Sequence, residues 1–194
     1  SLSKRFEING LKFKDARLKA NILFYRRDHQ ALERLQKILT ASLQPEMEPV
    51  LWLAEGYLAE LCEKSKEAFD AYEKIVELGE NQVLEDALIS IASLSLKIKN
   101  IPNALLAMEC LTGISPTYFP RYAELLKIRG RHQEALDIYA EYLDRFPEDV
   151  PTLLRLANYY KELDHPEAVR AVLEHLLEID PNNKAARLAF ASLK

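Results

Sequence analysis

Apolar residues recur three and four positions apart along almost the whole chain, which is the spacing that places them on one face of an α-helix. Short polar breaks containing Pro, Asn, Asp or Gly separate these runs. The pattern predicts an all-α chain without strands. The predicted helices are 12–26, 29–40, 48–63, 66–78, 83–98, 101–112, 118–129, 132–145, 150–162, 166–179 and 184–193.

Start and stop signals support these boundaries. Asn100 precedes a first-turn proline, and Asp164 does the same with Glu167 at the spacing of a capping box. Ser65 and Asp149 are further N-cap candidates. Gly79 and Gly113 are expected to end helices, and Gly130 to occupy a turn that needs a positive φ. Residues 1–10 predict a frayed or capping segment.

A small residue followed four positions later by a bulky one recurs along the chain. The leading residues are separated by 37, 36, 31 and 34 positions, which average 34.5. A period near 34 is that of the tetratricopeptide repeat. The leading residues are Ala31, Ala68, Ala104 and Ala135, and Val169 takes the same place in the last unit.

The preceding helices carry a matching series that begins with Trp52, Gly56 and Ala59. Over residues 12 to 181 the chain therefore resembles the tetratricopeptide pattern W-x2-L-G-x2-Y…A-x3-F…P, although Glu55 stands where the pattern has Leu. The resemblance implies one right-handed superhelical α-α solenoid domain over residues 1–194. Its units are expected near 12–48, 49–84, 85–115, 116–149 and 150–183, followed by a final helix at 184–194.

The chain lacks an initiator Met and stops inside a helical pattern, so we expect a fragment of a longer protein. The final helix has two interpretations: a capping helix, or the first half of a further unit.

Close helix contacts explain the small residues of the repeat. Gly or Ala on the first helix of a unit, at Gly56, Ala92, Ala123 and Ala157, lets the second helix approach. Two cysteines, Cys62 and Cys110, fall in predicted helices at a spacing that fits neither a metal site nor a redox pair. We therefore predict that both are buried.

Composition narrows the class of protein. Apolar residues make up 48% and charged residues 29%, which predicts a folded chain rather than a disordered one. The net charge of −4 and the dispersed Lys and Arg disfavour nucleic-acid binding. No apolar run is long enough to insert in a membrane. No secretory signal is readable at the N-terminus, but in a chain expected to be a fragment this says little about the compartment. The localisation is left open, with the cytoplasm favoured.

Residues that carry chemistry are scarce. His29, His132 and His165 fall at turns one repeat apart, so they cannot converge on one metal, and His175 is expected to be exposed. No metalloprotease, phosphate-loop, dinucleotide or nucleophile-elbow motif occurs. We therefore predict no catalytic residues, metal or cofactor, and a protein that is not an enzyme.

The resemblance implies that the first helix of each unit lines a concave groove. This groove is apolar in its N-terminal half and mostly cationic in its C-terminal half, which suits a partner with an apolar segment followed by acidic residues. In the alternative, Leu53, Ile89 and Leu96 are core residues, and the basic residues merely belong to a solvated face. The groove candidates are Leu53, Tyr57, Ile89, Ser93, Arg121, Glu124, Lys127, Leu154, Arg155, Asn158 and Lys161, joined in the first unit by Phe13, Ala16, Ala20 and Leu23.

Three functions remain open. The leading one is a scaffold that binds a partner protein or peptide in this groove within a multiprotein assembly. A substrate-recruiting or regulatory arm of a larger enzyme is the alternative, and RNA binding is a third. Asn158 matches one position of the family's clamp for acidic chaperone tails, but Leu154 replaces its Lys partner, so that clamp is not predicted. The sequence leaves the oligomeric state open.

Overall fold

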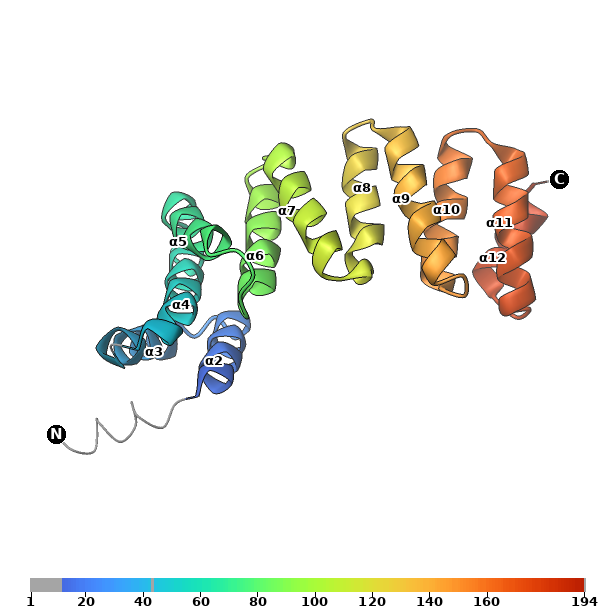
Figure 1. The fold of residues 1–194 in the computed structure, drawn as a ribbon. Helices are drawn as coiled ribbons and strands as arrows, with labels where there is room; N and C mark the ends of the chain where they lie inside the picture. The colour runs from blue at the N-terminus through green and yellow to red at the C-terminus, as the bar shows by residue number, and fades with distance from the viewer. Residues whose placement is uncertain (1–11, 43, 194) are drawn as a thin grey trace. The chain divides into compact units, whose positions relative to one another are not determined.

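A computed structural model describes residues 12–42 and 44–193 of the chain, and these residues form α-helices and short 3-10 turns without a strand (Figure 1). Each predicted helix boundary lies within two residues of the observed one. The observed helices are α2 (Phe13–Tyr25), α3 (His29–Ser42), α4 (Glu48–Leu61), α5 (Ser65–Glu77), α6 (Leu84–Lys97), α7 (Ile101–Ile114), α8 (Phe119–Ile128), α9 (His132–Arg145), α10 (Val150–Glu162), α11 (Pro166–Ile179) and α12 (Lys184–Ala191).

Consecutive helices pack as pairs, so the predicted all-α solenoid of helix pairs is confirmed. The chain divides into two compact units, one ending at Ile114 and the other beginning at Ser115. The first contains the pairs α2–α3, α4–α5 and α6–α7. The second contains α8–α9 and α10–α11, with α12 packed on α11. The single domain and its repeat boundaries stay predictions.

Small residues lie at the helix crossings, as the repeat predicted. Ala68, Ala104 and Ala135 have no exposed surface, and Ala123 is buried as completely. In the second unit the core of α10, α11 and α12 also contains Ala157 and Leu173. Close approach at these positions removes apolar surface from water, which is the main stabilising contribution to a stack of helices.

The turn inside every pair has the same backbone conformation. One residue adopts a positive φ of 54° to 72°, and the next residue donates its N–H to the carbonyl five positions earlier, as in a Schellman motif. A positive φ was predicted at only one of these turns, at Gly130, because the other four turns hold residues that rarely adopt this conformation. The positive-φ residues of these five turns are Arg27, Glu63, Lys99, Gly130 and Asp164.

Lys99→Gly is expected to stabilise the protein by about 0.5–1 kcal/mol. The left-handed conformation costs a residue with a side chain roughly 1–2 kcal/mol, and glycine avoids this cost. Part of the gain is lost because glycine is more flexible in the unfolded chain. Urea denaturation measures the change. Gly130→Ala is the opposite control and should destabilise the protein, whereas a Lys99→Gly variant weaker than wild type would contradict the explanation.

The capping predictions were partly right. Asn100 accepts from the Asn103 backbone at 3.3 Å, and Gly79 follows α5 with a positive φ, as expected. Asp149 precedes α10, but its carboxylate accepts from the Thr152 hydroxyl at 2.5 Å rather than capping a backbone N–H.

Three capping predictions were wrong. Ser65 is the first residue of α5, so it follows the cap position. Asp164 is the positive-φ turn residue, and His165 takes the cap position without a side-chain bond, so no capping box forms with Glu167. Gly113 lies inside α7 instead of ending it.

The prediction that both cysteines are buried was also wrong, because Cys62 and Cys110 are exposed. Cys62 follows the last turn of α4. Cys110 lies one turn from Leu106 and from Ile114, which are themselves 62% and 44% exposed. Burial could not be read from residue type in α7, because its apolar residues surround the helix.

The predicted segment at residues 1–10 lies outside the described residues. Within the described part of the chain, no helix is long and apolar enough to cross a membrane. In the same residues, no group of three or more His, Cys, Asp or Glu side chains is placed to hold a metal ion.

Candidate functional site

The groove candidates of the first compact unit lie mostly in its interior. Leu53 has no exposed surface and Tyr57 only 3%. The Tyr57 ring stacks on Phe24 with centroids 4.1 Å apart, and its hydroxyl donates to Asn21 Oδ1 at 2.8 Å. Ile89 is half-buried, and Ser93 is exposed. Leu53 and Tyr57 therefore contribute to packing rather than to an accessible surface.

Three of the four groove candidates from the first predicted repeat, which lie on α2, are buried as well. Ala16 and Ala20 have no exposed surface, and Leu23 has 9%. Ala20 lies 36 residues before Gly56, so it occupies the small-residue contact position rather than a groove position. Phe13 is half-buried.

Polar contacts cross this unit from its first pair to its third. Arg17 Nε lies 2.5 Å from Asp86 Oδ2, and Asn21 Nδ2 donates to Asp86 Oδ1 at 3.1 Å. The hydrogen bond to Asp86 raises the pKa of Arg17. Arg17 and Asn21 lie on α2 and Asp86 lies on α6. Together with Tyr57 they form one hydrogen-bonded network. Sequence reasoning missed Arg17 and Asn21, although the 36-residue step back from Leu53 and Tyr57 points to them.

A buried tyrosine also fixes a carboxyl group of α4. Tyr72 has no exposed surface, and its hydroxyl donates to Glu60 Oε1 at 2.6 Å. Burial raises the pKa of Glu60, whereas this hydrogen bond and the charge of Lys97 act in the opposite direction. Glu60 thus belongs to the packing of the α4–α5 pair.

The second compact unit presents exposed polar side chains from α8 and α10. The two helices carry equivalent residues 34 positions apart, so Arg121 corresponds to Arg155, Glu124 to Asn158 and Lys127 to Lys161. We call these six residues the α8–α10 surface. Its exposed members are Arg121, Arg155, Asn158 and Lys161.

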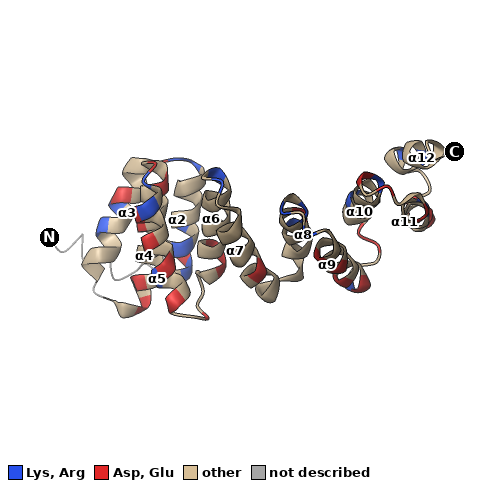
Figure 2. Ribbon diagram, turned by 90° about the horizontal axis from the view of Figure 1, so that it is seen from above, with Lys and Arg blue, Asp and Glu red and all other residues tan. Residues whose placement is uncertain are grey.

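The other two members are held by neighbouring side chains. The Tyr139 hydroxyl donates to Glu124 Oε1 at 2.7 Å. Lys127 Nζ lies 2.7 Å from Glu162 Oε2 and 4.8 Å from the centroid of the Tyr159 ring. On the α8–α10 surface, Glu124 and Lys127 are therefore held in place, whereas Arg121, Arg155 and Lys161 are exposed cations; blue Lys and Arg positions mark both helices in Figure 2.

Burial raises the pKa of Tyr139, its hydrogen bond to Glu124 does so further, and the positive charge of Arg155 opposes the increase. The Arg155 guanidinium on α10 thus acts electrostatically on Tyr139, whose hydroxyl binds Glu124 of α8. Leu154, by contrast, packs against the core of the second unit, so it offers little surface to a partner.

The histidines are placed as the repeat predicted. His29, His132 and His165 are exposed at turns, one in each of three pairs. His132 Nδ1 lies 2.8 Å from the Tyr159 hydroxyl, and His175 Nε2 lies 3.1 Å from the Pro147 carbonyl oxygen. His132 and His175 therefore each contact a residue more than 20 positions away in the sequence.

Comparison with known proteins agrees with this architecture. Residues 126–193 match a family model described as tetratricopeptide repeat. No curated protein sequence matches the chain. The family match is confined to residues 126–193, and the fold shared with tetratricopeptide repeat proteins, described below, extends the likeness to the rest of the chain.

Solved structures resemble the chain over most of its length. YrrB, described as a TPR protein with an unusual peptide-binding site, is 19% identical with a TM-score of 0.62, and the match covers 97% of each chain. PilW, a type IV pilus biogenesis factor, is 14% identical with a TM-score of 0.64, covering 91% of this chain and 82% of its own.

A tetratricopeptide repeat protein from Parabacteroides merdae is 17% identical with a TM-score of 0.63, covering 76% of this chain and 59% of its own. At such identities the likeness concerns the fold. The tetratricopeptide repeat fold suggests a scaffold for protein–protein interaction.

Proposed function

We propose that this chain is a scaffold that binds an acidic segment of a partner protein on the α8–α10 surface within a multiprotein assembly. The observation that carries the proposal is the repetition of exposed polar side chains on neighbouring first helices, with Arg121 on α8 and Arg155, Asn158 and Lys161 on α10. YrrB, which shares the fold, is described as having a peptide-binding site.

The chemistry of these side chains favours a carboxylate-bearing peptide. An Arg guanidinium binds a carboxylate with two parallel N–H donors, and a Lys adds a point charge. The Asn158 amide both donates and accepts, so it suits the backbone of an extended peptide. Burial of Leu53 and Tyr57 leaves only the half-buried Ile89 and the 39% exposed Leu96 from the apolar half of the predicted groove, so the proposal is restricted to the acidic half of the ligand.

Arg155→Glu is expected to weaken capture of the partner about tenfold or more, since a hydrogen bond to a charged group contributes about 1.5–3 kcal/mol and the new carboxylate repels the ligand. Affinity capture with quantitative mass spectrometry, comparing wild type with the variant, measures the loss. Arg187→Glu is the matched control, because it makes the same change at an exposed position of α12.

Both variants should melt like the wild type, because neither arginine is buried. Partner retention by Arg155→Glu and Arg121→Glu equal to that of Arg187→Glu would exclude the α8–α10 surface. RNA retained by wild type but lost in the Arg121→Glu and Arg155→Glu double variant would favour RNA binding instead.

A further inference from the structure

Helix α7 has an exposed apolar stripe. Among its residues only Glu109 is charged, and the helix is almost entirely tan in Figure 2. Leu106 is 62% exposed, and Cys110 is exposed one turn further on. Exposed apolar side chains gathered on one face mark surfaces that bind other molecules.

The stripe faces α5 across a cavity of about 230 Å³. Phe69 and Val76 of α5 form the opposite wall, and Leu88 and Ile91 of α6 form the floor. We call this cavity and its lining the α5–α7 groove. Its lining residues all belong to the first compact unit, so the groove is independent of the α8–α10 surface.

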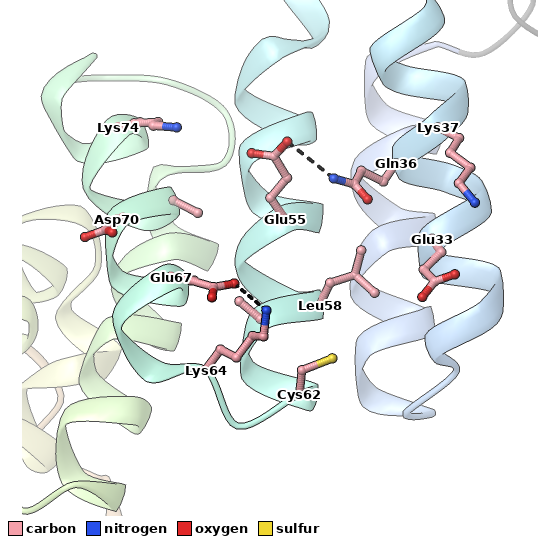
Figure 3. Close-up of a pocket in the computed structure, with 12 residues that line it drawn as sticks. Glu33, Gln36, Lys37, Glu55, Leu58, Cys62, Lys64, Glu67, Asp70 and Lys74 are labelled. Carbon is pink, nitrogen blue, oxygen red and sulfur yellow. Dashed lines mark hydrogen bonds and ion pairs between the residues drawn. The ribbon is translucent and has the colours of Figure 1, made fainter.

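The preceding repeat provides an internal comparison. The corresponding α3–α5 groove has a volume of about 650 Å³. Residues of α3, α4 and α5 line it (Figure 3). Its lining carries charges of both signs, and Lys64 pairs with Glu67 at 3.0 Å.

A step of 36 residues maps one groove onto the other. Glu33 corresponds to Phe69, Glu55 to Ile91, Asp70 to Leu106 and Lys74 to Cys110. Four charged positions of the α3–α5 groove are thus uncharged in the α5–α7 groove. The α3–α5 groove shows that the fold tolerates charge at each of these positions. The exposed Leu106 is therefore not required for packing.

The rim of the α5–α7 groove also carries negative charge. Glu73 and Glu77 are exposed one turn apart on α5, and within the described residues neither forms an ion pair or a side-chain hydrogen bond. At the Glu73 position the α3–α5 groove has Lys37. The apolar walls and the acidic rim together define the chemistry of the occupant.

We propose that the α5–α7 groove binds an amphipathic helical segment of a partner protein. The segment inserts leucine-like side chains between Phe69 and Leu106 and presents a lysine or arginine to Glu73 and Glu77. Two helices with a groove between them suit an apolar helix face, since such a face projects anchors at intervals of one turn.

The test uses a fluorescein-labelled, alanine-based helical peptide with two leucines one turn apart and a lysine one turn beyond. Fluorescence anisotropy should show saturable binding to the wild-type chain. Leu106→Asp should weaken this binding about tenfold or more, because it replaces the apolar wall with a charge. Asp70→Ala, at the equivalent position of the α3–α5 groove, is the matched control and should bind as wild type does.

Charge reversal tests the acidic rim. The Glu73→Lys and Glu77→Lys double variant should prefer a peptide carrying glutamate in place of lysine. Equal binding by wild type and a folded Leu106→Asp variant, or no binding by wild type, would overturn the proposal. A wild-type dimer in sedimentation that Leu106→Asp dissociates would also overturn it, since the occupant would then be a second copy of this chain.

Discussion

Gly56→Ala is expected to destabilise the protein by about 1–3 kcal/mol, the usual cost of overpacking a core. In most helix interiors the same change stabilises by about 1 kcal/mol. Here the sign reverses, because a Cβ on Gly56 would lie 2.2 Å from Cε1 of Tyr72. The ring has nowhere to move, since Tyr72 is fully buried and bound to Glu60.

Gly113→Ala is the matched control. It makes the same change inside α7, where nothing lies within 4 Å of an added Cβ. We expect a gain of about 0.5–1 kcal/mol there, because alanine loses less backbone entropy on folding. Urea denaturation of both variants measures the two free energies, and a Gly56→Ala variant as stable as wild type would show that the contact is not restrictive.

Tyr57→Ala is expected to destabilise the protein by about 3–5 kcal/mol, as other buried aromatic-to-alanine changes do. The variant loses the stacking on Phe24 and the edge contact with Tyr72, whose ring centroid lies 6.2 Å away. It also leaves Asn21 without the hydroxyl that binds it at 2.8 Å. Melting of purified variants measures the loss.

Tyr57→Phe isolates the hydroxyl and should cost only about 0.5–1.5 kcal/mol. Arg155→Ala should melt like the wild type, because Arg155 is exposed. The three variants separate a packing role from a binding role. A Tyr57→Ala variant with wild-type melting but poor partner capture would return Tyr57 to the binding surface.

The repeat made most of the fold predictable. Apolar periodicity located the helices, and the period near 34 identified how they pair, because a helix pair cannot bury its apolar face alone. The same reasoning failed for Cys110, since α7 is apolar on all sides and periodicity cannot show which face is covered.

The candidate site was less predictable. Residue type and spacing placed Arg121 and Arg155 on equivalent, exposed positions. The repeat pattern also predicted that Leu53 and Tyr57 line the groove, yet both are buried. Tyr57 packs against Phe24 and binds Asn21, both in the preceding helix pair, so its burial depends on contacts between repeats rather than within one.

Two tyrosines show where sequence information ends. Tyr72 follows Gly56, and Tyr139 follows Ala123, at the same spacing of 16 residues. Tyr72 directs its hydroxyl to Glu60, whereas Tyr139 directs its hydroxyl to Glu124. Alanine and glycine look interchangeable in the repeat, but only the packed structure shows that the Tyr72 ring occupies the space of a Gly56 side chain.

The sequence by itself determined the helices, their pairing and the small residues at the crossings, because these follow from local periodicity. It also predicted the positive φ at Gly130. The tertiary structure alone decided that Lys99 and Asp164 take the same conformation, that Arg17 reaches Asp86, and which apolar side chains stay exposed. Those outcomes depend on how neighbouring repeats pack, and the period of one repeat carries no information about the surface that the next one covers.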